Sequence, residues 1–165
     1  MKAFVISSPK VGSVVEVPEP HIGDQDLLVE IERVGICGTD VEFFNGDMAY
    51  LASGHAKYPL QLGHEWCGRV IEIGSKVDSH WRGKFITGDT MLGCQKCDRC
   101  SSGYQHLCHD RDEVGIRNGY PGALAERLVI PEFAAHELPN GLDPALGAMV
   151  EPTGNALRSL DADRI

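Results

Sequence analysis

Hydrophobic and polar residues alternate in short runs over roughly the first ninety positions, a pattern typical of β-strands. β-Branched and alternating residues predict strands at residues 2–6, 14–17, 27–34, 69–73 and 84–87. Glycine and proline separate these runs, at Gly12, Pro18, Pro20, Gly68, Gly74 and Gly83. Because the chain contains 19 glycines, we expect a barrel-like arrangement with many tight turns.

Residues 93–121 break this pattern. They are polar, rich in glycine and cysteine, and show little periodicity, so they cannot bury enough apolar surface to fold unaided. A bound metal could supply the missing free energy, since structural zinc contributes about 10–16 kcal/mol in small zinc-binding peptides.

The last part of the chain predicts one more strand, at residues 123–130, and two helices. Asp143 followed by Pro144 predicts a helix start, with the helix running towards residue 149. Pro152 interrupts this helix, and residues 153–160 predict the second one. The predicted fold class is therefore mainly β with short helices.

Composition narrows the function classes. The 165 residues suffice for one domain with a real core, and the contents of 42% hydrophobic and 24% charged residues are ordinary for a globular protein. The formal net charge of −9 argues against nucleic-acid or anionic-membrane partners, and no apolar stretch approaches the ~20 residues of a membrane span. The opening apolar run reaches Pro9 too soon for a signal peptide, so we expect a cytoplasmic protein.

Four cysteines at C-x2-C-x2-C-x7-C are the strongest chemical signal: Cys94, Cys97, Cys100 and Cys108. Four thiolates can close a tetrahedron around one Zn²⁺, at Zn–S distances of ~2.3 Å, and leave no open coordination position. His106 and His109 flank Cys108 and are alternative fourth donors. Disulfides are disfavoured because the chain shows no secretory signal.

A second set of donors has the composition of an open metal site. A catalytic zinc takes about three protein ligands and leaves the fourth position for water or substrate. Cys37 and His64 are suitable donors, and Glu65 offers a carboxylate. Thr39 could place a hydroxyl beside a metal-bound oxygen, and Asp40 could accept the second ring N–H of the histidine.

These motifs resemble the zinc-containing medium-chain alcohol dehydrogenases over essentially the whole chain. The matching motifs are Cys37-Gly38-Thr39-Asp40, the four-cysteine segment and Gly63-His64-Glu65-x2-Gly68-x5-Gly74-x2-Val77. The resemblance implies a GroES-like, partly open β-barrel, one catalytic and one structural zinc, and NAD- or NADP-linked oxidation of a small alcohol by a homo-oligomer. It further implies a catalytic domain over residues 1–150, with a structural-zinc lobe at 93–121 and the start of a connection to a dinucleotide-binding domain at 151–165.

The resemblance also assigns roles. Cys37 and His64 would be catalytic-zinc ligands, Glu65 a direct or exchanging ligand, and Thr39 the hydroxyl that takes the substrate proton. Glu151 matches a carboxylate near zinc in the polyol and threonine dehydrogenase branch, where ethanol-type members have cysteine.

Two features depart from the family pattern. Glu42 stands where many members have a proton-relay histidine. No G-x-G-x-x-G fingerprint is present, so the family's Rossmann domain is absent from this chain and we expect the chain alone to be inactive.

Simpler interpretations remain for several of these residues. Cys37 could be an inert buried thiol, as we expect for Cys67, and Glu65 a hydrogen-bond acceptor outside the metal shell. Thr39 could cap a helical turn at residues 41–44, and Glu151 could be a carboxylate favoured at a helix start.

Two alternative functions would require fewer of these metal-binding motifs. A zinc-stabilised binding or interaction module would need the four-cysteine segment but not the open site. A zinc-independent quinone-reductase-like protein would resemble the fold but lack both zinc motifs.

Overall fold

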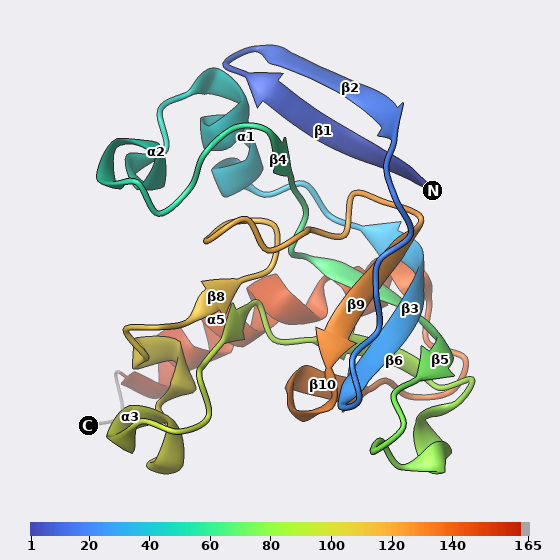
Figure 1. The fold of residues 1–165 in the computed structure, drawn as a ribbon. Coiled ribbons are helices and arrows are strands. Elements are labelled where there is room, and N and C mark those ends of the chain that lie inside the picture. The colour runs from blue at the N-terminus through green and yellow to red at the C-terminus, as the bar shows by residue number, and fades with distance from the viewer. Residues whose placement is uncertain (163–165) are drawn as a thin grey trace.

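The structure, a computed structural model, describes residues 1–162, with side chains described to residue 160. Figure 1 shows a mainly β molecule with short helices around the sheets. The strands are β1 (Lys2–Ser8), β2 (Val11–Glu16), β3 (Asp26–Val34), β4 (Leu60–Gln61), β5 (Trp66–Ile73), β6 (Phe85–Gly88), β7 (Met91–Leu92), β8 (Asp112–Glu113), β9 (Arg127–Pro131) and β10 (Ala135–Glu137). The helices are α1 (Gly38–Asn45), α2 (Ala49–Ser53), α3 (Asp98–Ser101), α4 (Pro144–Ala148) and α5 (Val150–Ala162).

The largest sheet has five strands in the order β10-β6-β5-β3-β9, and neighbouring strands are antiparallel. β1 lies between β2 and β4 in a three-stranded sheet, and β7 pairs with β8. The sheets do not close on one another, and an isolated bridge between Ala3 and Ala125 links the first sheet to the segment before β9. The predicted partly open β arrangement is thus confirmed.

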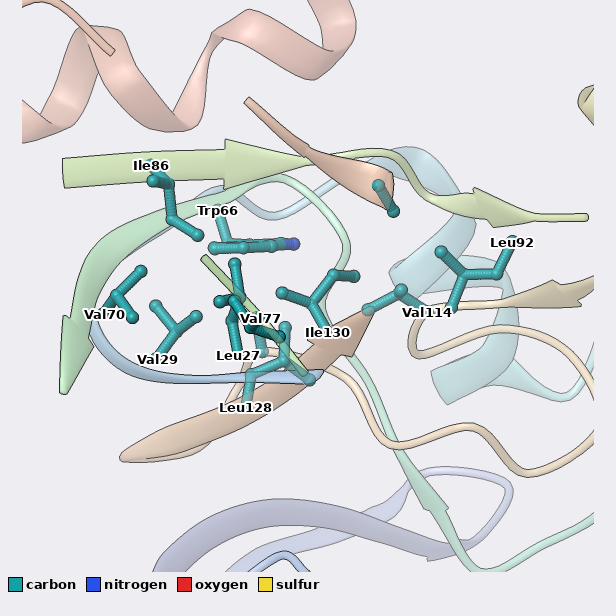
Figure 2. Close-up of a cluster of buried hydrophobic side chains, with 12 residues drawn as sticks. Leu27, Val29, Trp66, Val70, Val77, Ile86, Leu92, Val114, Leu128 and Ile130 are labelled. Atoms are coloured by element: carbon teal, nitrogen blue, oxygen red, sulfur yellow. The ribbon is translucent and has the colours of Figure 1, made fainter. Parts of the chain in front are cut away.

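The main core lies against the five-stranded sheet. Figure 2 shows the Trp66 ring at its centre, with Leu27 and Val29 of β3 and Leu128 and Ile130 of β9 around it. All five side chains are buried. Alternate residues of β3 and β9 point inwards, which is the period-2 pattern that the sequence shows there.

We expect Ile130→Ala to lower the free energy of unfolding by about 2–5 kcal/mol, because it removes buried methyl groups and leaves a cavity. Urea unfolding measures the change. Val14→Ala on β2 is the matched control, because that side chain is 65% exposed and its truncation should cost well under 1 kcal/mol. Equal unfolding midpoints for the two variants would contradict this account of the core.

The strand predicted at residues 123–130 begins later than expected, at Arg127. The residues before it bond elsewhere: the N–H groups of Gly122 and Leu124 donate to the carbonyls of Gln61 and Leu62. This long-range pairing takes residues 122–124 away from β3, so only residues 127–131 form β9.

Of the two C-terminal helices, α4 begins where the sequence predicts and α5 begins earlier than predicted. α4 begins after Asp143, whose Oδ1 accepts a hydrogen bond from the N–H of Ala145 at 2.8 Å, as predicted. α5 begins at Val150 rather than after Pro152. Proline is tolerated in a first helical turn because its missing N–H has no partner there. The two predicted helices are therefore present, but the break between them lies at Met149 and not at Pro152.

Figure 1 shows α5 running behind the sheets towards the cysteine-rich lobe. Residues 163–165 of the predicted connection lie outside the described part of the chain. Among the described helices, none combines the length and apolar character needed to cross a membrane.

Candidate metal centres

The pairing of β3 with β5 brings the two halves of the open site together. Val34 pairs with Trp66 at the end of this ladder. One residue further along, the N–H of Gly35 donates to the carbonyl of Glu65 at 2.6 Å. The Cys37 motif follows β3 and the His64–Glu65 pair precedes β5. Both therefore lie at the same end of this strand pair.

Donor atoms of Cys37, His64 and Glu65 lie within 4.8 Å of one another. His64 and Glu65 are buried, and Cys37 is half-buried at the N-terminus of α1. One thiol, one imidazole and one carboxylate at these separations can hold a single divalent cation, and three protein ligands leave the fourth position of a tetrahedral zinc for a reactant.

Asp40 is placed to hold His64. Its Oδ2 accepts a hydrogen bond from the N–H of Cys37 at 2.9 Å, while Oδ1 lies 3.7 Å from Nδ1 of His64. Both side chains are about 5% exposed, and neither Oδ1 nor Nδ1 has a hydrogen-bond partner among the described residues. Unpaired buried polar atoms cost about 1–3 kcal/mol each. A cation held by the other ring nitrogen would fix the proton on Nδ1, facing Asp40, so the residues present fit a metal.

Gly35 contributes to this site and was missed by the sequence analysis. A Cβ atom at this position would lie 3.1 Å from Cβ of Glu65 and would meet its carboxylate. The missing side chain therefore makes the room that Glu65 occupies. A glycine directly after a predicted strand, two residues before Cys37, was the available signal.

Gly35→Ala should weaken divalent-metal binding at the open site by about tenfold, the lower end of the loss seen when groups that position ligands are disturbed. The added methyl group displaces Glu65, whereas the four-cysteine site should keep its affinity. Metal titration followed by mass spectrometry measures both sites. Gly154→Ala is the control, because no atom lies within 4 Å of its added Cβ. Unchanged affinity in Gly35→Ala would show that this close contact does not position Glu65.

Thr39 lies inside the first turn of α1, which begins at Gly38 with Cys37 as its N-cap. The interpretation of Thr39 as the cap of a turn at residues 41–44 is therefore wrong. Glu42 is exposed and lies three residues after Thr39, on the same side of the helix one turn along.

The structure does not bring Glu151 into the Cys37–His64–Glu65 group. It lies in the first turn of α5, half-buried, and accepts a hydrogen bond from Nδ2 of Asn155 at 2.9 Å. It lines a cleft of about 370 Å³ together with His136 and Thr90. Its position is that of a helix-start carboxylate, and its role near zinc stays a prediction.

The four cysteines of the lobe form the second group. Their thiols lie within 4.8 Å of one another, with Cys108 buried and the others half-buried. The Cys97 and Cys108 sulfurs are 3.8 Å apart, far beyond the ~2.05 Å of a disulfide, and all six cysteines are free thiols. The disulfide alternative is thus excluded in this structure.

Neither histidine beside Cys108 joins this group among the described residues. His106 contacts Arg158 through Nε2 at 2.7 Å, and burial together with the nearby guanidinium lowers its pKa. His109 is exposed. The set with the right proximity is therefore the all-cysteine one.

Backbone geometry around the lobe gathers these thiols. Gln95, between the first two cysteines, has a positive φ of 59°, and Cys97 is the N-cap of α3. The N–H of Lys96 hydrogen-bonds to the Cys94 sulfur and lowers its thiol pKa to about 7, whereas desolvation raises the pKa of Cys100 to about 12.

Cys67 behaves as predicted, as a small buried side chain. It is fully buried on β5, and its Sγ donates to the carbonyl of Pro144 at 3.1 Å. Desolvation raises the pKa of this thiol to about 11, so it stays protonated and unreactive.

Residues 23–140 match the model of the alcohol dehydrogenase GroES-like domain. The chain belongs to this family. The relation agrees with the partly open β arrangement and with the two donor groups described above. It also confirms the resemblance to zinc-type medium-chain dehydrogenases that the sequence motifs indicate.

Several relatives of this GroES-like domain carry the name L-threonine 3-dehydrogenase. The protein of Rhizobium rhizogenes is 37% identical over 160 residues, and that of Cutibacterium acnes is 39% identical over 162. The match covers 96% of this chain in both cases, but 45% and 46% of those proteins. The chain thus spans a little under half the length of these curated relatives.

Solved structures give the same picture of the GroES-like domain. A protein described as a zinc-binding dehydrogenase from Sinorhizobium meliloti 1021, bound to NADP, superposes with a TM-score of 0.86 at 38% identity. The match covers 98% of this chain and 45% of that one. Galactitol-1-phosphate dehydrogenase from Escherichia coli superposes with a TM-score of 0.81 at 29% identity, covering 92% of this chain and 42% of its own.

Proposed function

We propose that this chain is the catalytic-domain portion of a zinc-dependent alcohol dehydrogenase of the polyol or threonine type. The full protein would oxidise a primary or secondary alcohol and transfer hydride to NAD or NADP. The observation that carries the proposal is the gathering of Cys37, His64 and Glu65, with buried and unpaired atoms of His64 and Asp40 beside them. The relatives named L-threonine 3-dehydrogenase support the substrate class.

The residues of the open site would have separate roles in binding the metal and orienting its ligands. Cys37, His64 and Glu65 would hold the zinc, which when bound supplies a Lewis acid that makes a substrate hydroxyl more acidic near neutral pH. Asp40 would orient His64 by accepting the Nδ1 proton. Glu151 would be a further carboxylate near the zinc, as in the polyol and threonine dehydrogenase branch that the chain resembles.

Thr39 would accept the proton of the substrate hydroxyl and pass it outwards. Glu42, one turn along α1 and exposed, is the group that could receive it, in the place of the histidine found in many family members. The hydride would leave the substrate carbon for the nicotinamide ring, bound by parts of the full protein beyond this chain. Hydride and proton together complete a two-electron oxidation.

The four cysteines would hold a second zinc that stabilises the lobe and takes no part in the chemistry. A homo-oligomeric assembly, which the family resemblance implies, and a cytoplasmic location, which the opening residues indicate, are part of the same proposal. The domain limits, residues 1–150 for the catalytic domain and 151–165 for the start of the connection, are proposed as well.

Metal counting on the purified chain tests the proposal. We expect about two zinc ions per chain in the wild type and about one in Cys37→Ser, because the serine hydroxyl is a poor replacement for a thiolate at this site. Cys67→Ser is the matched control and should keep both ions. A wild type that holds one ion even with excess zinc, unaffected by Cys37→Ser, would favour the zinc-stabilised binding module instead.

A further inference from the structure

A buried carboxylate lies at the end of the cysteine-rich lobe. Glu113 belongs to β8, and its side chain is 4% exposed. Its Oε1 accepts a hydrogen bond from Nε of Arg111 at 2.6 Å and another from the hydroxyl of Tyr50 at 3.2 Å. A buried carboxylate needs such partners, because burying a charge without them is costly.

The two arginines beside Glu113 reach back to the segment that carries the last cysteine. Nη1 of Arg111 donates to the carbonyl of Cys108 at 2.9 Å, and Nη2 of Arg117 donates to the carbonyl of His109 at 3.2 Å. Nη1 of Arg117 lies 4.0 Å from Oε1 of Glu113. Both guanidinium groups are mostly buried, at 19% and 11% exposed.

We propose that Glu113 is a positioning residue for the four-cysteine metal centre. By holding Arg111 and Arg117, it fixes the backbone at Cys108 and so the place of the fourth sulfur. The inference rests on the proposed function in one respect, namely that the four cysteines bind metal.

The sequence explains why Cys108 needs such support. The other three cysteines lie close together, around the short helix α3, so local backbone geometry can gather them. Cys108 follows eight residues after Cys100 and is the one buried member of the group. Its position depends on how the chain leaves the lobe, which the arginine contacts determine.

Glu113, Arg111 and Arg117 also affect the charge balance around the four cysteines. Four thiolates around one divalent cation carry a net negative charge, and guanidinium groups bonded to the adjacent carbonyls partly compensate it. Without Glu113, these guanidinium groups would lack their buried counter-charge and would turn towards water. The contact between Arg111 and the carbonyl of Cys108 would then be lost.

Tyr50 extends the network beyond the lobe. Its hydroxyl donates to Glu113 and accepts from Nη2 of Arg111 at 3.3 Å, and its ring lies 5.9 Å from the guanidinium carbon of Arg117. Since Tyr50 is in α2, the same carboxylate also attaches this helix to the lobe.

The test uses the whole chain and cobalt as a spectroscopic substitute for zinc, with a chelator competing for the metal. All proteins in this test carry Cys37→Ser, so that the thiolate-to-cobalt absorption bands report the four-cysteine site alone. We expect Glu113→Gln to weaken metal retention there by about tenfold and to alter the band intensities, because loss of groups that orient ligands costs about 10–100-fold in affinity. Glu113→Asp should recover part of the loss, since it keeps the charge. Glu137→Gln, which removes an exposed partner of Lys84 on β10, is the matched control and should behave as the wild type.

Arg111→Lys is the second variant and covers the case in which Glu113→Gln does not fold. It keeps a positive charge beside Glu113 but loses the fork that reaches the carbonyl of Cys108, so it should also weaken cobalt retention. Wild-type affinity and spectrum in both variants, or in Arg111→Lys alone where Glu113→Gln is unfolded, would overturn the inference. A Cys37→Ser protein without thiolate-to-cobalt bands would overturn the proposed structural zinc itself, which separates the two failures.

Discussion

Cys97→Ser is expected to abolish metal binding by the four-cysteine lobe and to unfold residues 93–121. Few side chains of this segment are buried, and its regular structure is limited to α3, β8 and short 3₁₀ turns. Structural zinc contributes about 10–16 kcal/mol in small zinc peptides, whereas a whole domain is stable by about 5–15 kcal/mol. The loss of the whole contribution would therefore exceed the about 2–5 kcal/mol expected for a single core truncation.

Limited proteolysis within the lobe and metal analysis of the same sample check this result. Proteolysis should become rapid at residues 93–121 while the five-stranded sheet resists. Cys67→Ala is the matched control, because that thiol lies in a separate cluster with Phe85 and Leu138, and it should cost packing energy but no metal. A Cys97→Ser protein that keeps both its metal and its resistance to protease would contradict the role given to the four thiols.

His64→Ala in the full-length protein should lower kcat/KM for alcohol oxidation by about 10³-fold or more. The Lewis acidity that a zinc in the proposed open site would supply is worth several kcal/mol of barrier, and each ~1.4 kcal/mol is a factor of ten in rate. Steady-state kinetics with polyols and amino alcohols, with NAD and NADP, measure the effect. His80→Ala is the control, because this exposed histidine pairs with Asp78, away from both metal centres.

The isolated 165-residue chain should show no such turnover with any of these substrates, because the parts proposed to bind the nicotinamide lie beyond it. Robust oxidation by this chain would contradict the proposal that the nicotinamide is bound by other parts of the full protein. Full activity of His64→Ala in the longer protein would instead contradict the proposed open zinc site, so the two results test different claims.

Much of the fold could be predicted from local patterns. The alternation along β1, β3, β5 and β6 gave strand positions within a few residues of those observed, since side chains of a strand point to opposite faces by geometry alone. Asp143 and Pro144 likewise fixed the start of α4 through capping. The start of β9 could not be found this way, because hydrogen bonds from Gly122 and Leu124 to a distant segment compete with the sheet.

The two candidate metal centres also differ in how far local sequence predicts them. The four cysteines lie so close along the chain that their spacing alone identifies the donor set, and the structure adds the contacts through which Arg111 joins the carbonyl of Cys108 to Glu113. Cys37 and His64 are far apart in sequence, and motif resemblance was needed to associate them. Their proximity depends on the register of β3 with β5, and a shift of this pairing by one residue would separate the two donors.

By itself, the amino-acid sequence determined which donors this protein carries, which segments are strands and which family it resembles, because thiols, imidazoles and alternating side chains act through local chemistry. Only the tertiary structure decided that Gly35 makes room for Glu65, that Asp40 faces His64, and that Glu151 lies apart in α5. Those outcomes depend on where distant segments pack against each other, and local spacing carries no information about that.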